Sequence, residues 1–171
     1  MYLGLGSNLG DRRAHLSAAL TRIGSLAGLV RTSPFYESDP VGFASQPRFL
    51  NAVVEIRWGR SAPALLAALK KIERSGGRIP MFPNGPRAID CDILDFGGRV
   101  ARQKGLVLPH PRLHERRFAL APLAALAPRW RHPILNLTAR ELLARLLKAP
   151  GVRKIRPFVI PRSAATRNRP S

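Results

Sequence analysis

Hydrophobic residues follow a period of two in several stretches of the chain, and this pattern predicts β-strands. In the segment 49–58, FLNAVVEIRW, residues Leu50, Val54 and Ile56 would lie on one face and Asn51 on the other. The alternation therefore predicts a long strand that is covered on at least one side. Further strands are predicted from short apolar runs rich in β-formers at 1–6, 29–38, 88–96 and 105–111.

Helices are predicted where the hydrophobic period is close to 3.6 residues. Leu16, Leu20 and Ile23 recur at this spacing, and so do the apolar residues that follow Ser61, a residue type that caps helix N-termini. Clusters of proline, glycine and serine at 39–49 and 78–87 predict loops. The predicted helices cover 12–27, 62–75, part of 113–127 and, behind a capping box of Thr138 and Glu141, 139–149.

The order of these elements favours an α+β sandwich, in which a sheet carries helices, over a strict βαβ repeat. A chain of 171 residues is long enough for one domain with a sizeable core, and we assign residues 1–150 to it. The hydrophobic pattern decays after Pro150. Segment 151–171 has no acidic residue, several basic ones and several prolines, which predicts a tail that is disordered in part and could include a short strand at 158–160.

Net charge narrows the set of partners. There are 29 Lys and Arg residues against ten Asp and Glu, a formal charge of +19, and such a surface attracts nucleic acid or nucleotide phosphate. A compositional bias toward arginine would produce the same excess. Few aromatic residues and no RNA-recognition motif argue against nucleic acid. With one cysteine and no run of eighteen apolar residues or signal-like start, we expect a cytoplasmic protein without a membrane span.

The segment 85–98, GPRAIDCDILDFGG, places two of the few acidic residues one residue apart in an apolar run. On a strand, Asp90 and Asp92 would project from the same face, and Cys91 would be a small buried hydrophobe on the other. Two such carboxylates can hold one or two Mg²⁺ ions for phosphoryl or nucleotidyl transfer, with Arg87 as a phosphate clamp. Alternatively, both aspartates pair with arginines on a solvated face, because a D-x-D pattern alone does not decide.

Two other stretches carry candidate chemistry. GLGSNLG at 4–10 lies between a strand and a helix, but its spacing matches neither the dinucleotide nor the P-loop pattern, so it predicts only a tight turn. His110 and His114 have the spacing of metal ligands on a helix, but Pro111 interrupts them and no third ligand is evident. We prefer a phosphate-facing His110 that acts together with Arg116.

These stretches occur in one order over about residues 1–133: YLGLGSNLGDR, SPFYESDPVGFASQPRFLNAVVEI, IERSGGR, GPRAIDCDIL and LPHPRLHERRFALAPL. The chain thereby resembles 6-hydroxymethyl-7,8-dihydropterin pyrophosphokinase, a family of folate biosynthesis. That family transfers the β,γ-pyrophosphoryl unit of ATP to the hydroxymethyl group of a reduced pterin and releases AMP. The resemblance implies a ferredoxin-like, three-layer α/β/α sandwich with a largely antiparallel sheet, two Mg²⁺ ions, ATP as co-substrate, small-molecule partners and a monomer or weak dimer.

The resemblance also implies roles for individual residues. Asp90 and Asp92 match the family's metal-binding aspartates, and Asn51 matches an asparagine that hydrogen-bonds the edge of the pterin ring. Arg78 and Arg87 match arginines that grip the phosphates during the reaction, and Phe118 matches a stacking partner of the pterin. The implied ATP-binding residues are Glu73, Arg78, Arg87, Ile93, His110 and Arg116, and the implied pterin-binding residues are Ser38, Val41, Phe49, Asn51 and Phe118.

One loop departs from the family pattern. Where many members have two arginines and an aromatic residue, this chain has Pro80, Pro83 and Asn84. Because two cations are lost and two φ angles are fixed, we expect the loop 78–87 to hold ATP less tightly or to close differently. Two other functions stay open: a basic nucleic-acid-binding protein, and another D-x-D nucleotidyltransferase that would release pyrophosphate instead of AMP.

Overall fold

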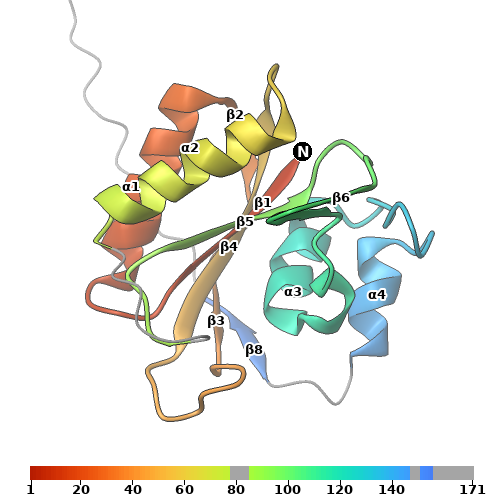
Figure 1. The fold of residues 1–171 in the computed structure, drawn as a ribbon. Helices are drawn as coiled ribbons and strands as arrows, with labels where there is room; N and C mark the ends of the chain where they lie inside the picture. The colour runs from red at the N-terminus through yellow and green to blue at the C-terminus, as the bar shows by residue number, and fades with distance from the viewer. Residues whose placement is uncertain (78–84, 147–150, 156–171) are drawn as a thin grey trace, which may run out of the picture.

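The computed structural model describes residues 1–77, 85–146 and 151–155 (Figure 1). Within them, six strands form one antiparallel sheet in the order β5-β1-β4-β3-β8, and the sixth strand, β2, pairs with β4. A separate two-stranded hairpin consists of β6 and β7. The strands are β1 (Tyr2–Ser7), β2 (Gly28–Thr32), β3 (Tyr36–Ser38), β4 (Phe49–Arg57), β5 (Asp90–Asp95), β6 (Ala101–Gln103), β7 (Leu106–Leu108) and β8 (Val152–Lys154).

Helices cover both faces of the sheet and make three layers. Helices α1 (Arg12–Leu26) and α2 (Ala62–Ser75) lie on one face, and α3 (Arg117–Leu126) lies on the other, with α4 (Ala139–Arg145) packed beside it (Figure 1). A 3₁₀ turn, η1 (Leu113–Glu115), precedes α3. None of the helices in the described ranges is long and apolar enough to cross a membrane.

The order of elements confirms the predicted α+β fold. Since β1 occupies one side of β4, both β2 and β3 must pair with its other side and together take the place of one strand in the sheet. Counting β2 and β3 as one strand, the chain runs β-α-β-β-α-β, and the fourth strand of that unit, β5, lies next to the first. This is the ferredoxin-like arrangement, with both α1 and α2 on the same face.

Strand β4 shows why both layers of helices are needed. Leu50, Val54 and Ile56 belong to the hydrophobic cluster beneath α1 and α2, whereas Val53 packs with residues of α3, among them Leu120. All five side chains are at least 98% buried. The predicted alternation is therefore confirmed, and the strand is covered on both faces because each face carries its own apolar residues.

The helix starts follow their capping residues. The Asp11 side chain accepts a hydrogen bond from the Ala14 N–H, and the Ser61 side chain caps α2 in the same way. Thr138 and Glu141 form the predicted capping box at α4. These caps confirm the predicted starts, because each side-chain oxygen satisfies an N–H that has no partner within its helix.

Two element predictions were wrong in detail. The stretch 29–38, expected as one strand, is divided into β2 and β3, because Ser33 turns inward at the break. Its N–H donates to the carbonyl of Val53 at 2.8 Å, its hydroxyl accepts the Val53 N–H at 3.0 Å, and Pro34 has no N–H to continue a ladder. The hairpin strand β6 was not predicted at all.

The C-terminal stretch also differs from expectation. Residues 152–154, which we had placed in the tail, form β8 and pair with β3 at the edge of the sheet. The remainder of that tail, including the strand expected at 158–160, lies outside the described residues.

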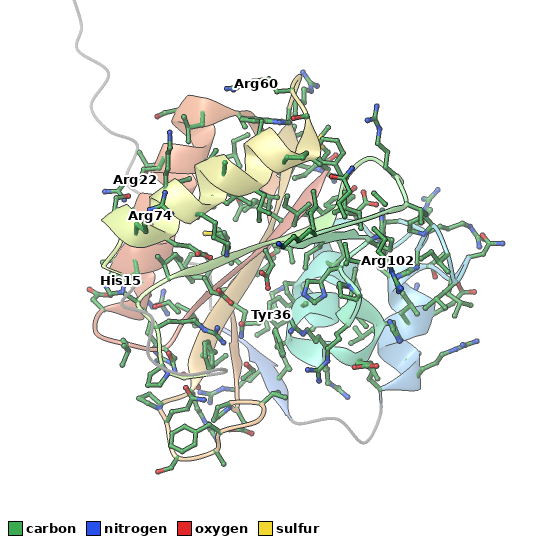
Figure 2. All side chains as sticks on the ribbon, viewed as in Figure 1. His15, Arg22, Tyr36, Arg60, Arg74 and Arg102 are labelled. Atoms are coloured by element: carbon green, nitrogen blue, oxygen red, sulfur yellow. The ribbon has the colours of Figure 1, made fainter. Side chains whose placement is uncertain are left out.

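Much of the basic excess projects into solvent away from the sheet, as at Arg60, Arg74 and Arg102 (Figure 2).

Candidate active site

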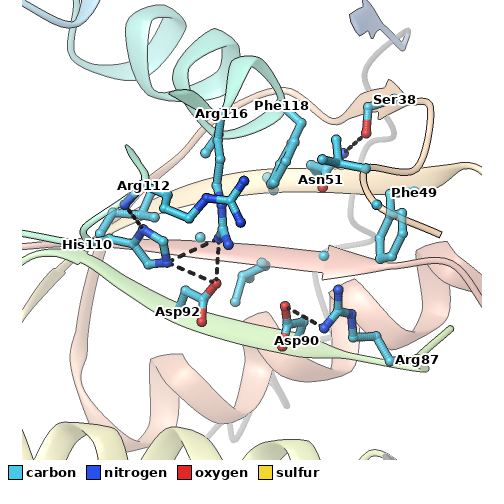
Figure 3. A pocket seen from close by; sticks show the side chains of 18 of the residues that line it. Ser38, Phe49, Asn51, Arg87, Asp90, Asp92, His110, Arg112, Arg116 and Phe118 are labelled. Atoms are coloured by element: carbon cyan, nitrogen blue, oxygen red, sulfur yellow. Dashed lines mark hydrogen bonds and ion pairs between the residues drawn. The ribbon is translucent and has the colours of Figure 1, made fainter. Parts of the chain in front are cut away.

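A cavity of about 310 Å³ opens between the sheet and α3, where β1, β4 and β5 meet (Figure 3). Strand β1 makes room for it, because Leu3 and Leu5 point into the α1–α2 layer while Gly4 and Gly6 present no side chain to the cavity. Its lining comprises Gly4, Leu5, Gly6, Ser38, Asp39, Val41, Gly42, Phe49, Asn51, Ala52, Lys70, Arg87, Asp90, Asp92, Leu94, His110, Arg112, Arg116, Phe118 and Ala119.

One end of the cavity is acidic and is ringed by cations. Asp90 and Asp92 point into it from β5, as predicted, while Cys91 lies fully buried on the other face of the strand. Arg87 Nη1 lies 3.5 Å from Asp90 Oδ2, and Arg116 Nη1 lies 3.4 Å from Asp92 Oδ2. Pairing of both aspartates with arginines, the alternative left open by the sequence, is therefore present. It occurs inside a pocket, however, and not on a solvated sheet face.

The ionised form of Asp92 is held in an unfavourable electrostatic environment. Burial, followed by the charge of Asp90, raises the pKa of Asp92, and the nearby Arg116 and Lys70 only partly offset this. The described residues contain no group of three or more His, Cys, Asp or Glu placed to bind a metal. The pair alone therefore fits a hard divalent cation whose other ligands come from substrate phosphates and water, which is how Mg²⁺ is usually bound.

His110 and Arg116 direct two hydrogen-bond donors to the same place. The His110 Nδ1 accepts the Arg112 N–H at 3.1 Å, which assigns the ring proton to Nε2 when the ring is neutral. Burial and the charge of Arg116 lower the pKa of His110 to about 4, so the ring is neutral at pH 7. Its Nε2 lies 3.1 Å from Arg116 Nη1 and 3.9 Å from Asp92 Oδ2. Two donors this close favour an anionic oxygen between them.

The other end of the cavity is aromatic and amide-lined. Asn51 is 5% exposed, and its Nδ2 donates to Ser38 Oγ at 2.9 Å and to the Tyr36 carbonyl at 3.3 Å. Phe49 and Phe118 flank the same space (Figure 3). Such an arrangement suits a flat heterocycle, with an amide at its edge and aromatic rings against its faces.

Two cations join the acidic and aromatic ends. The guanidinium carbon of Arg87 lies 5.4 Å from the centre of the Phe49 ring, and that of Arg116 lies 5.6 Å from the Phe118 ring. The Nε of Arg87 is buried and has no hydrogen-bond partner among the described residues. Because buried guanidinium nitrogens are normally bonded, this atom favours a ligand that accepts a hydrogen bond there.

The structure brings most of the predicted site residues together. Ten of them line the cavity: Ser38, Val41, Phe49, Asn51, Arg87, Asp90, Asp92, His110, Arg116 and Phe118. The sequence did not single out Lys70, Asp39 or Arg112, which line it too. Lys70 precedes Glu73 by one helical turn, and that spacing was the only available signal.

Two predicted ATP-binding residues, Glu73 and Ile93, are not in this lining, and a third lies outside the described residues. Glu73 is 2% exposed on α2, where it accepts the Cys91 N–H at 2.8 Å and pairs with Lys70 at 2.9 Å. The side chain of Ile93 is 5% exposed and belongs to the core beneath α1 and α2. Arg78 lies outside the described residues, as do Pro80, Pro83 and Asn84, so the expectations for this loop stay predictions.

The turn at 4–10 has a structural role that its spacing did not reveal. Asn8 is 1% exposed, and its Nδ2 donates to Gln46 Oε1 at 2.9 Å and to the Pro47 carbonyl at 3.1 Å. Its Oδ1 accepts the Arg87 N–H at 2.8 Å. One buried amide thus holds two loops that border the cavity.

Comparison with known proteins identifies the family. The profile of 7,8-dihydro-6-hydroxymethylpterin-pyrophosphokinase (HPPK) matches residues 2–128, more than half of the chain. The chain belongs to the HPPK family. The 2-amino-4-hydroxy-6-hydroxymethyldihydropteridine pyrophosphokinase of Aquifex aeolicus is 39% identical to this HPPK chain over 141 residues, which cover 82% of this chain and 88% of the relative. That of Pseudomonas aeruginosa is 43% identical over 135 residues, 78% and 83% of the two chains.

Some HPPK relatives are much longer than this chain. Folic acid synthesis protein FOL1 of Dictyostelium discoideum is 34% identical over 157 residues, which are 92% of this chain but 24% of that protein. The chain thus spans about a quarter of its length. Among solved structures, wild-type Plasmodium falciparum HPPK-DHPS with pterin and p-hydroxybenzoate superposes on 84% of this chain and 42% of its own, with a TM-score of 0.66 and 19% identity. That similarity confirms the fold.

Proposed function

We propose that this chain transfers the β,γ-pyrophosphoryl group of ATP to the hydroxymethyl group of 6-hydroxymethyl-7,8-dihydropterin, giving AMP and the pterin diphosphate. The observation that carries this proposal is the two-ended cavity. Asp90, Asp92 and their cations form one end, and Asn51 between two phenylalanines forms the other. A reaction that joins a triphosphate to a flat heterocycle needs both ends in one enclosure.

At the acidic end, Asp90 and Asp92 would hold two Mg²⁺ ions, which neutralise triphosphate charge and make the attacking hydroxyl more acidic. Arg87, Arg116 and His110 would bind the phosphate oxygens, since their donors converge beside the aspartates. These groups are in place before reaction, so most of the rate gain would come from orientation and electrostatic stabilisation. Arg78 would add a further cation from its loop.

Ile93 and Glu73 would act through the edge of β5. Side chains of Ile93 and Cys91 share the core face, and their main-chain groups share the strand edge that faces away from β1. At that edge the Cys91 N–H is already bonded to Glu73. Ile93 would therefore contact the nucleotide with its main chain, and Glu73 would hold Lys70 and the β5 edge in position.

At the aromatic end, Asn51 would hydrogen-bond the pterin edge, and Phe49 and Phe118 would stack on its faces, with Ser38 and Val41 completing the wall. The hydroxymethyl oxygen would attack the β-phosphorus of ATP, the bond from that phosphorus to the α-phosphate oxygen would break, and AMP would leave. The hydroxyl proton would pass to solvent. No side chain is assigned as general base.

The test is an incubation with ATP, Mg²⁺ and 6-hydroxymethyl-7,8-dihydropterin, followed by separation of the nucleotides. Asp92→Asn removes a carboxylate from β5, and Glu55→Gln, on β4 and outside the cavity lining, is its matched control. We expect AMP that depends on the pterin and is lost only in Asp92→Asn. Formation of ADP or pyrophosphate would mean another transfer reaction. No turnover together with tight, salt-sensitive RNA binding would favour the nucleic-acid function.

A further inference from the structure

We propose that Glu37 is a positioning residue whose ion pairs tie the C-terminal strand β8 to the segments that form the pterin side of the cavity. The inference deepens the proposed function and rests on it. Strand β8 begins at Val152, well beyond residue 128, where the family match ends. The family profile therefore does not include this strand.

Glu37 gathers arginines from three separate parts of the chain. Its side chain is 12% exposed; Oε1 lies 3.1 Å from Arg12 Nη1, and Oε2 lies 2.9 Å from Arg153 Nη2 and 3.8 Å from Arg48 Nη1. Arg12 begins α1, Arg48 ends the loop 39–48, and Arg153 is the middle residue of β8. We call these four residues the Glu37 clasp.

The clasp closes the base of the loop 39–48. Arg48 Nε lies 2.9 Å from Asp39 Oδ1, so the last residue of the loop is paired with its first. Arg12 Nη1 also donates to the Arg48 carbonyl at 2.8 Å. Since Val41 and Gly42 from this loop line the cavity, the clasp sets where that wall stands.

Strand β3 connects the clasp to the pterin-recognising amide. Glu37 pairs with Arg153 of β8 in the strand register, and the next residue, Ser38, pairs with Val152. Side chains alternate along a strand, so Ser38 faces the cavity, where it accepts a hydrogen bond from Asn51. A shift of β3 caused by loss of β8 would therefore move the partner of Asn51.

The effect of the Glu37 clasp can be measured as a dependence of pterin affinity on salt. The pterin has no net charge, and the clasp does not line the aromatic end. A direct contact between the pterin and a charged group of the clasp therefore does not explain a salt effect on pterin affinity at saturating ATP. Salt screens exposed ion pairs, and Arg153 is 76% exposed. The wild-type KM for the pterin should therefore rise with ionic strength, and removal of Arg153 should flatten that dependence.

The experiment compares Arg153→Ala with Arg153→Lys and with the control Arg31→Ala. Arg31 also pairs with a strand glutamate, Glu55, but on β2 and away from the loop 39–48. For Arg153→Ala we expect a roughly three-fold higher KM for the pterin, the size of one exposed ion pair, with kcat and the KM for ATP unchanged. Arg153→Lys should restore part of the affinity, and Arg31→Ala should leave the pterin KM as in the wild type.

Amide hydrogen exchange of residues 39–48, measured without substrates, gives a readout that does not depend on activity. Exchange should be faster in Arg153→Ala than in Arg31→Ala or the wild type. Unchanged exchange and unchanged KM in Arg153→Ala, or equal effects from Arg31→Ala, would overturn the inference. An enzyme inactive on the pterin would refute the proposed function alone, because the exchange rates would still decide whether the clasp positions the loop.

Discussion

Asn8 and Arg87, 79 residues apart in the chain, are joined by two hydrogen bonds. The Arg87 N–H donates to Asn8 Oδ1 at 2.8 Å, and the Asn8 N–H donates to the Arg87 carbonyl at 3.1 Å. The side-chain Nδ2 of Asn8 also donates to Gln46 and Pro47, in the loop that borders the aromatic end. Asn8 therefore sets the position of Arg87, the proposed phosphate-binding cation, relative to the wall of the proposed pterin site.

Substitution of Asn8 should separate these two tasks. Asn8→Ala leaves the Arg87 N–H without its acceptor, and we expect a loss of about 1–3 kcal/mol in the free energy of unfolding together with a fall in kcat. Asn8→Asp keeps the acceptor and loses the donors to Gln46 and Pro47. It should retain more of kcat and raise the KM for the pterin. Denaturant unfolding and steady-state kinetics measure both, and identical kinetics for the two variants would contradict the division of roles.

Gly6→Ala should reduce pterin affinity with little effect on folding. The added Cβ would lie 3.4 Å from Asn51 Oδ1 and 3.7 Å from Phe49 Cδ1, so it fits the fold but fills the floor of the aromatic end. Alanine also removes the entropic cost of a strand glycine, about 0.5–1 kcal/mol. We expect an unchanged or higher Tm with a raised KM for the pterin. Gly59→Ala, where the new Cβ meets nothing within 4 Å, is the control and should change neither the KM nor kcat.

Asp92→Asn should lower the activity and raise the thermal stability. Burial and the neighbouring Asp90 raise the pKa of Asp92, which means that its ionised form destabilises the ligand-free fold. The neutral amide should therefore raise Tm in metal-free buffer, while the loss of a proposed metal ligand should lower kcat roughly a thousand-fold. Thermal unfolding in EDTA and the AMP assay measure the two effects. A lower Tm for the variant would show that Asp92 mainly serves the fold.

His132 should make the fold sensitive to acid. It is 3% exposed, and its Nδ1 accepts the N–H groups of Ile134 at 3.3 Å and Leu135 at 3.2 Å, so protonation there would break both bonds. Burial, followed by the charge of His114, lowers the pKa of His132 below its ordinary value of about 6.5. The unfolded chain then binds more protons in this range, and stability should fall as pH drops below about 6.5.

The measurement for His132 is chemical denaturation between pH 8 and pH 5. His132→Asn offers an acceptor that does not titrate, and the slope of stability against pH should be smaller in this variant than in the wild type. His15→Asn is the control, because the Nδ1 of His15 has no hydrogen-bond partner among the described residues. Equal slopes for the wild type and His132→Asn would show that another group governs the acid response.

Local patterns were sufficient for most elements because their causes are local. The alternation of 49–58 placed β4 and assigned its two faces correctly, since each residue's side is fixed by the pleat. Capping residues placed the starts of α2 and α4, and the hydrophobic period placed α1. The break at Ser33 and the strand β8 were missed, because both depend on partners in β4 and β3 that no local window contains.

The order of residues in the chain determined that Asp90 and Asp92 share a face of the strand and that Cys91, which lies between them in sequence, is buried on the opposite face. It also determined that the family motifs follow one another. Only the tertiary structure decided that this face opens into a cavity shared with Asn51, Phe49 and Phe118, and that β8 closes the sheet beside it. The physical reason is the reach of each interaction. Side-chain direction is set within two residues, whereas a cavity and an ion-pair cluster exist only where distant segments meet.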